Sequence, residues 1–214
     1  MYSRHDHAWL SSAGWTEALN GAAPEHAQAL GQWRSRDWPL IVTRRTPDAP
    51  PGTVSLGLAL PPDGGCKRRI ALHVSEHALA RVADPLPLQA AAAAAPARWT
   101  APLASLLADA GNITLRTYGS LALQAVTGLS YLTDSSDIDL LFTPASRREL
   151  DAGLHLLQTH AQNLPLDGEI VFPGDAAVAW KEWRDAAGND ARVLVKDANA
   201  VRLATTSSLR DLLA

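Results

Sequence analysis

Hydrophobic and polar positions alternate along the chain in short stretches, separated by turns that contain glycine or proline. In the first 85 residues, a helix with its turns is predicted over residues 16–37. Three strands bounded by turn residues are predicted to follow it, at 39–45, 53–61 and 68–75. Residues 75–83 open on Ser75, a residue type that caps helices, and predict a helix that closes this segment.

The pattern after residue 99 predicts strands and helices in alternation. The strands are predicted at 112–120, 137–142, 168–173 and 191–198. The helices between them are predicted at 121–128, 146–163 and 175–186, the second with Ser146 as its N-cap. Trp180 and Trp183, three residues apart in the last of these helices, are expected in the core rather than as a platform for adenine. A small mixed sheet covered by helices follows from this order.

A run of six alanines flanked by prolines separates the two patterns. It carries few large side chains that could pack, so residues 86–98 are predicted to be a linker, although alanine also favours a short helix. The sequence therefore predicts an α+β protein with a smaller N-terminal domain over residues 1–85. Residues 99–214 would form the second, larger domain.

Composition narrows the possible functions. The 214 residues are 47% hydrophobic, enough for a real core in each domain, and the net charge of −3 gives no basic field that would hold nucleic acid. The single cysteine, Cys66, excludes an intramolecular disulfide framework and a cysteine-rich zinc site. No apolar run is long enough to span a bilayer and nothing at the N-terminus resembles a signal peptide, so a cytoplasmic protein without a membrane partner is expected.

One cluster of polar residues is not needed by an ordinary core. Asp137 and Asp139 alternate into the apolar run of a predicted strand, so both carboxylates project to one face. Two aligned carboxylates are ligands that Mg²⁺ takes from a protein when phosphates and water complete its octahedron. Gly119 and Ser120 stand at a strand-to-helix turn, where glycine admits a phosphate to the backbone and the helix N-terminus attracts it. The stretch is therefore predicted to hold a metal and a polyphosphate.

This constellation resembles the nucleotidyltransferase superfamily, whose members carry Gly-Ser, an acidic-x-acidic pair and a third carboxylate on a later strand. Gly119, Ser120, Asp137 and Asp139 match the first two elements. The resemblance implies Glu169 as the third carboxylate and metal ligand, with Asp167 two residues away as the alternative.

A narrower resemblance covers nearly the whole chain. The segments "RHDHAWL", "YGSLALQAVTGLSYLTDSSDIDLLF", "DGEIVFPGDAAVAWKEW" and "VLVKD" are similar to those of the phosphoribosyl-dephospho-CoA transferases, or holo-ACP synthases, of bacterial malonate decarboxylase. The resemblance implies transfer of the phosphoribosyl-dephospho-CoA group from triphosphoribosyl-dephospho-CoA to a serine of the apo acyl carrier subunit, with release of diphosphate. It also implies Mg²⁺ as the cofactor.

Several basic residues are candidates for phosphate or carrier binding. Lys181 and Lys196 lie in the C-terminal domain, where a strand-end ammonium could meet phosphate oxygens. Arg68 and Arg69, together with Lys67, Arg44 and Arg45, lie at strand ends of the N-terminal domain and could contact the donor or an acidic carrier. The alternative for each is a solvated surface charge.

Two other function classes share the same residues. Another nucleotidyltransferase, acting on a small molecule, a protein or RNA, would use the same Gly-Ser turn and aspartate pair. A non-catalytic nucleotide-binding module is less consistent with the sequence, because both aspartates of the pair are present.

Overall fold

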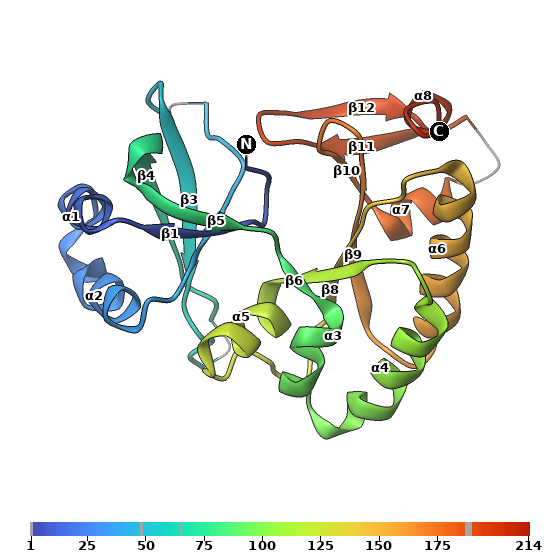
Figure 1. Cartoon of the computed structure of the whole chain (residues 1–214), viewed down its shortest axis with the longest axis horizontal. Helices are drawn as coiled ribbons and strands as arrows, with labels where there is room; N and C mark the ends of the chain where they lie inside the picture. Colours follow the sequence, from blue (N-terminus) through green and yellow to red (C-terminus); the bar gives the residue numbers. More distant parts are fainter. Residues whose placement is uncertain (1, 48, 65, 187–189) are drawn as a thin grey trace. The chain divides into compact units, whose positions relative to one another are not determined.

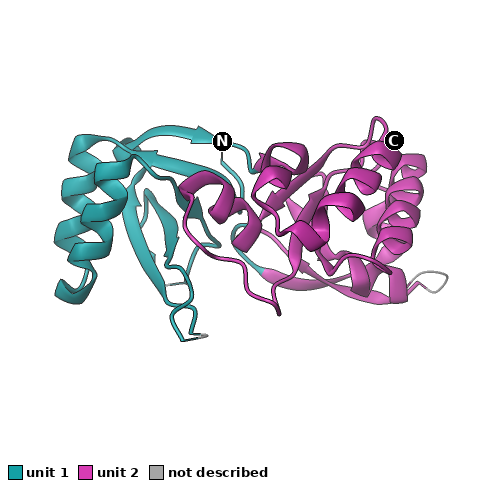
Figure 2. Cartoon of the chain, turned by 90° about the horizontal axis from the view of Figure 1, so that it is seen from below, with its two compact units in different colours: residues 1–85, 198–200 teal, residues 86–197, 201–214 magenta. Residues whose placement is uncertain are grey.

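A computed structural model describes residues 2–47, 49–64, 66–186 and 190–214. The chain divides into two compact units (Figure 2). Unit 1 comprises residues 1–85 and Ala198–Ala200, and unit 2 comprises Leu86–Asp197 and Val201–Ala214. Each unit combines helices with a β-sheet, which confirms the α+β class.

Unit 1 is built on a five-stranded antiparallel sheet with the order β4-β3-β2-β1-β5 (Figure 1). Its strands are β1 (His7–Leu10), β2 (Leu40–Val42), β3 (Thr53–Ala59), β4 (Arg69–Ser75) and β5 (Leu79–Ala83). Its helices are α1 (Ser12–Gly21), α2 (Ala27–Arg36) and the short 3₁₀ turns η1 (Pro24–His26) and η2 (Glu76–Ala78). Trp15 of α1 and Leu30 and Trp33 of α2 are buried, so both helices contribute to the core of this unit.

The helix predicted over 75–83 is wrong. Only the single turn η2 forms, and Leu79–Ala83 continues as β5, which pairs with β1. The pairing of β5 with β1 supplies the backbone hydrogen bonds that a helix would have formed within itself. The pair also brings the Arg81 guanidinium to 3.7 Å from the centre of the Trp9 ring. Because β1 was not predicted, its partner strand could not be recognised from local pattern alone.

Unit 2 is built on a seven-stranded mixed sheet with the order β12-β11-β10-β9-β8-β7-β6. Its strands are β6 (Leu86–Pro87), β7 (Leu115–Tyr118), β8 (Ile138–Phe142), β9 (Leu166–Phe172), β10 (Ala176–Ala179), β11 (Arg192–Lys196) and β12 (Val201–Thr205). β8 and β9 are parallel, and the other neighbouring pairs are antiparallel.

Helices bury one face of this sheet. They are α3 (Leu88–Ala91), the 3₁₀ turn η3 (Ala92–Ala94), α4 (Ala97–Ala110), α5 (Gly119–Thr127), α6 (Arg147–His160), α7 (Trp180–Asp185) and α8 (Thr206–Arg210). Ile138, Leu140 and Phe142 of β8 point into this core, and Phe142 packs so closely against Gly153 of α6 that any Cβ there would overlap its ring. α6 begins as predicted, because the Ser146 hydroxyl accepts a hydrogen bond from the Glu149 amide at 3.2 Å.

Two segments of unit 2 differ from the sequence-based expectation. Residues 86–98, expected as a linker, form β6, α3, η3 and the start of α4, because Leu88 and Ala91 are completely buried and anchor the segment. The helix predicted over 175–186 begins only at Trp180, and the residues before it form β10 against β9. Trp180 and Trp183 are each 1% exposed and lie in the core, as expected.

Candidate active site

The turn between β7 and α5 lies against the carboxylate of Asp139. α5 begins at Gly119, whose φ of +65° is a backbone conformation that other residues rarely adopt. A Cβ at Gly119 would overlap the Asp139 carboxylate. Only glycine therefore allows this approach, and the N-terminus of α5 is adjacent to an aspartate of the Asp-x-Asp pair. Ser120, the next residue, is half-buried at the same helix end.

The connection between α5 and β8 is held by its own hydrogen bonds. The Gln124 side-chain carbonyl accepts from the amides of Tyr131 and Leu132, each at 3.0 Å. The Ser136 hydroxyl accepts from the Thr133 amide at 2.9 Å. These contacts fix the path of the chain where it enters β8, and so they fix the place of Asp137, which immediately precedes that strand.

Side chains from three neighbouring strands share the sheet face opposite the core. Asp139 of β8 pairs in register with Tyr118 of β7 on one side and with Asp167 of β9 on the other. Paired residues of adjacent strands project to the same face, so the side chains of Tyr118, Asp139 and Asp167 form one row, called the carboxylate row below. Asp139 and Asp167 are half-buried, and Asp137, two residues before Asp139, is exposed. The Thr117 hydroxyl donates to the Asp139 carbonyl at 2.8 Å, which ties β7 to β8 at this point.

Two lysines partner the carboxylates of β9. Lys181 Nζ lies 3.5 Å from Asp167 Oδ1, and Lys196 Nζ lies 3.3 Å from Glu169 Oε1. The Glu169 side chain is only 6% exposed, and both lysines are partly open to solvent. Glu169 pairs in register with Leu141, one row further along the sheet than Asp167 and Asp139. Asp167 is therefore the direct neighbour of Asp139, while the Glu169 carboxylate anchors Lys196.

Gly168 lets β9 approach β8 between these two acidic residues. Its φ is +125°, and a Cβ on Gly168 would overlap the backbone of Leu140. The sequence "LDGEIVF" thus places a glycine where the parallel strand needs close backbone contact, with an acidic residue on each side of it.

The donor set fits a hard divalent cation by its chemistry. Asp139 and Asp167 offer carboxylate oxygens on one sheet face, and Asp137 immediately precedes β8; carboxylate is the ligand type that Mg²⁺ prefers. Within residues 2–47, 49–64, 66–186 and 190–214, no three His, Cys, Asp or Glu side chains are already drawn together as a metal cluster. The carboxylates of Asp139 and Asp167 therefore share a face, and the three aspartates are not gathered around one point in this structure.

The remaining predicted residues have separate surroundings. Arg68 and Arg69 belong to unit 1, where Arg69 begins β4, and both are exposed. Arg45 has a structural contact, since its guanidinium donates to the carbonyls of Ala49 and Pro50 at 3.1 and 3.0 Å. Tyr118 was not predicted as a site residue, because its place beside Asp139 depends on a strand pairing 21 residues away in sequence.

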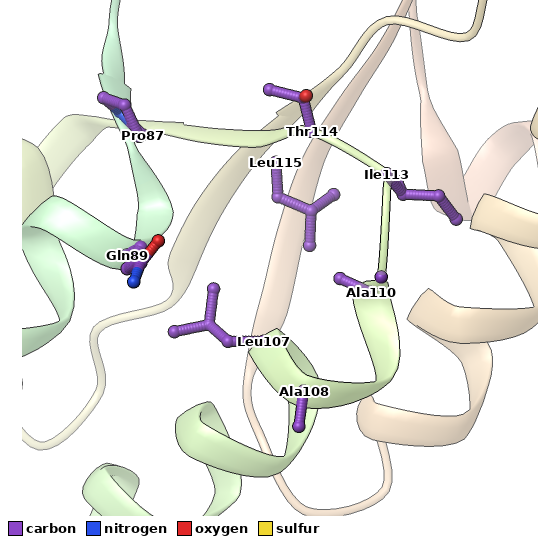
Figure 3. Close-up of a pocket in the computed structure, with 9 residues that line it drawn as sticks. Pro87, Gln89, Leu107, Ala108, Ala110, Ile113, Thr114 and Leu115 are labelled. Atoms are coloured by element: carbon purple, nitrogen blue, oxygen red, sulfur yellow. The ribbon is translucent and has the colours of Figure 1, made fainter.

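A pocket of about 430 Å³ lies at the other end of β7 (Figure 3). It is bordered by the C-terminal end of α4, by Pro87 of β6 and by Leu115, the first residue of β7. Gly119 follows the last residue of that strand, so the pocket and the carboxylate row are separated by the length of β7.

In the described part of the chain, no helix is long and apolar enough to cross a membrane.

Comparison with known proteins identifies the family. The model "Phosphoribosyl-dephospho-CoA transferase MdcG C-terminal domain" matches residues 82–207, and the model of the N-terminal domain of the same protein matches residues 3–85. No solved structure matches the chain.

Curated relatives match over almost the full length. A phosphoribosyl-dephospho-CoA transferase of Bradyrhizobium diazoefficiens is 40% identical over 206 residues, which cover 94% of this chain and 88% of the relative. One of Xanthomonas campestris pv. campestris is 38% identical over 213 residues, which cover 98% of this chain and 97% of the relative. The chain therefore belongs to the phosphoribosyl-dephospho-CoA transferase family.

Proposed function

We propose that the chain transfers the phosphoribosyl-dephospho-CoA group from triphosphoribosyl-dephospho-CoA to a serine of the apo acyl carrier subunit of malonate decarboxylase. It would act as a metal-dependent nucleotidyltransferase and release diphosphate. The observation that supports this most strongly is the N-terminus of α5 against Asp139, on the face that also carries Asp167. A phosphate-binding helix end beside aligned carboxylates suits phosphoryl transfer, and the names of the relatives specify the group transferred.

The reaction needs charge neutralisation and alignment more than covalent catalysis. The serine oxygen would form a bond to the α-phosphorus of the donor while the bond from that phosphorus to the diphosphate oxygen breaks. Backbone amides at Gly119 and Ser120 are suited to hold the departing diphosphate, since a helix N-terminus carries partial positive charge. Mg²⁺ bound by Asp137 and Asp139 would supply the charge that polarises the phosphoryl group.

The strand register supports a different third carboxylate from the one that the superfamily resemblance implies. Glu169, implied by the superfamily resemblance, lies one row beyond Asp139, whereas Asp167 is directly beside it. We therefore assign the third ligand position to Asp167. Glu169 would hold Lys196 through their 3.3 Å ion pair, so that the ammonium can meet donor phosphates. Lys181 forms the corresponding 3.5 Å ion pair with Asp167, and its ammonium would meet donor phosphates in the same way.

This assignment predicts different kinetic effects for the two acidic residues. Asp167→Asn should lower kcat by about a hundredfold, because it removes the proposed third metal ligand from the carboxylate row. Glu169→Gln should mainly raise the KM for the donor, because Lys196 loses the carboxylate that positions it. Steady-state measurement of diphosphate release over a range of donor concentrations distinguishes the two. A larger kcat loss in Glu169→Gln than in Asp167→Asn would return the ligand position to Glu169.

The exposed cations of unit 1 are proposed to contact the donor or an acidic carrier. Replacing both Arg68 and Arg69 by Glu should raise the KM for one of these substrates by about tenfold, and the effect should weaken with added salt. Arg34→Glu with Arg36→Glu makes the same change of charge on α2 of the same unit, where both arginines are also exposed. Equal KM values in the two double variants would show that Arg68 and Arg69 are ordinary surface charges.

The proposed activity is tested by the intact mass of the carrier. The full chain is incubated with triphosphoribosyl-dephospho-CoA, Mg²⁺ and apo carrier. The carrier should gain the mass of one phosphoribosyl-dephospho-CoA group, and a carrier whose acceptor serine is replaced by alanine should gain none. An unchanged carrier mass together with turnover of the donor on another acceptor would favour a different nucleotidyltransferase activity.

A further inference from the structure

The outermost strands of the two sheets differ in how they are protected from pairing with another chain. β6 has two residues and ends in Pro87, which cannot donate a backbone hydrogen bond. β4 presents Arg69 and His73 among its exposed positions, and β5 presents Arg81. Charged residues, proline and short length are the usual protections of such edges.

β12 lacks most of this protection. Val201 is 43% exposed and Leu203 is 59% exposed, although both are large aliphatic residues in a regular five-residue strand. β12 is the last strand in the order of its sheet, so no other strand of the described chain pairs with its outer side. An exposed apolar strand with an unpaired edge is a template for a further strand.

The backbone groups that point outward can be identified from the ladder with β11. The Thr206 amide donates to the Ala191 carbonyl at 3.0 Å, directly beyond the paired residues Arg192 and Thr205. In an antiparallel ladder, hydrogen-bonded pairs recur at every second residue. Residues 202 and 204 therefore bond to β11, and the amides and carbonyls of Val201 and Leu203 point away from it.

We propose that β12 pairs antiparallel with β12 of a second copy of this chain, with Leu203 opposite Leu203. This register lets the two Leu203 residues exchange both backbone hydrogen bonds around a two-fold axis. The apolar Leu203 side chains meet across the axis. Val201 then lies opposite Thr205 of the other copy.

Charge also favours this register. Arg202, the one cation within β12, lies opposite Ala204 of the other copy, so the two arginines do not face each other. The Thr205 carbonyl already accepts from the Ser208 hydroxyl at 2.8 Å, and its second lone pair is available to the other copy. A parallel pairing of β12 with itself would instead place identical residues, including Arg202, side by side.

The paired edge is remote from the carboxylate row along the sheet. β11 and β10 lie between β12 and β9, the strand of that row nearest to β12. Association through β12 therefore does not use the carboxylates or the turn at Gly119. Variants of β12 that prevent association should keep transferase activity close to that of the unchanged chain.

Sedimentation equilibrium of the full chain tests the proposal. The unchanged chain should reach twice its monomer mass of 22.8 kDa as concentration rises, and Leu203→Lys should remain at 22.8 kDa. Leu212→Lys is the matched control, because Leu212 is 47% exposed but lies outside β12, and this variant should still associate. A monomeric unchanged chain at all accessible concentrations, or equal association of Leu203→Lys, would overturn the proposal.

A crosslink tests the register without depending on the lysine variant. In a hydrogen-bonded antiparallel pair the two Cα atoms are about 5.5 Å apart, within the range of a disulfide. In a chain that also carries Cys66→Ser, Leu203→Cys should form a covalent dimer under mild oxidation, and Leu212→Cys should not. Absence of a Leu203→Cys dimer, or equal crosslinking at both positions, would contradict the proposed pairing.

Discussion

Asp139→Asn is expected to lower the rate of transfer by at least about a hundredfold while the chain stays folded. Asp139 is the middle residue of the row formed with Tyr118 and Asp167, and it lies against the N-terminus of α5. Asparagine keeps the shape of the side chain but removes the negative charge that a divalent cation requires. Diphosphate release measures the loss, and the thermal unfolding midpoint shows that the fold is retained.

Asp134→Asn is the matched control for this substitution. Asp134 lies five residues before Asp139, in the connection that leads to β8, and its exposed carboxylate forms a 3.0 Å ion pair with Arg98. Surface ion pairs contribute little to the free energy of unfolding, and Asp134 is not part of the proposed site. Asp134→Asn should therefore change the rate by no more than about twofold. Asp137→Asn should behave like Asp139→Asn. Near-normal turnover in both variants of the aspartate pair would exclude a two-aspartate site.

Gly119→Ala is expected to lower transfer by about a hundredfold, because the added methyl group overlaps the Asp139 carboxylate. Either the helix end or the carboxylate must move, and both belong to the proposed site. Gly128 provides an unusually close control at the other end of the same helix. Its φ of +71° resembles the +65° of Gly119, but a Cβ at Gly128 meets nothing within 4 Å.

Both alanine variants therefore have the same backbone strain, but only in Gly119→Ala does the added methyl group overlap the Asp139 carboxylate. Each substitution should cost about 1 kcal/mol of unfolding free energy from the left-handed conformation. Only Gly119→Ala should also lose activity beyond what its stability explains. The comparison needs diphosphate release and denaturant unfolding of both variants. Equal activity in Gly119→Ala and Gly128→Ala would show that the contact with Asp139 has no part in catalysis.

Local pattern was sufficient for elements whose ends and faces are encoded nearby. Ser146 caps α6 as predicted, and Gly128 ends α5 in a left-handed conformation. The Gly-Ser turn lies between strand β7 and the body of helix α5, where the pattern predicted a strand-to-helix turn, because strand, turn and helix are consecutive in sequence.

Elements that depend on distant partners were missed or misassigned. β5 resembles a capped helix until β1 pairs with it, and the alanine-rich segment resembles a linker until Leu88 is seen buried. The same limit applies to the site. The choice between Asp167 and Glu169 depends on the register of β9 against β8, and these strands are parallel and connected through α6. Alternation alone puts both acidic residues on one face and cannot rank them.

Anomalous diffraction from crystals grown with Mn²⁺ tests the central claim most directly, because Mn²⁺ accepts the same oxygen ligands as Mg²⁺ and can be located by its scattering. The carboxylate row predicts an anomalous peak in coordination contact with Asp137 and Asp139, which disappears in crystals of Asp139→Asn. A peak elsewhere on the molecule, or an unchanged peak in Asp139→Asn, would contradict the assignment of this sheet face as the metal-dependent transfer site.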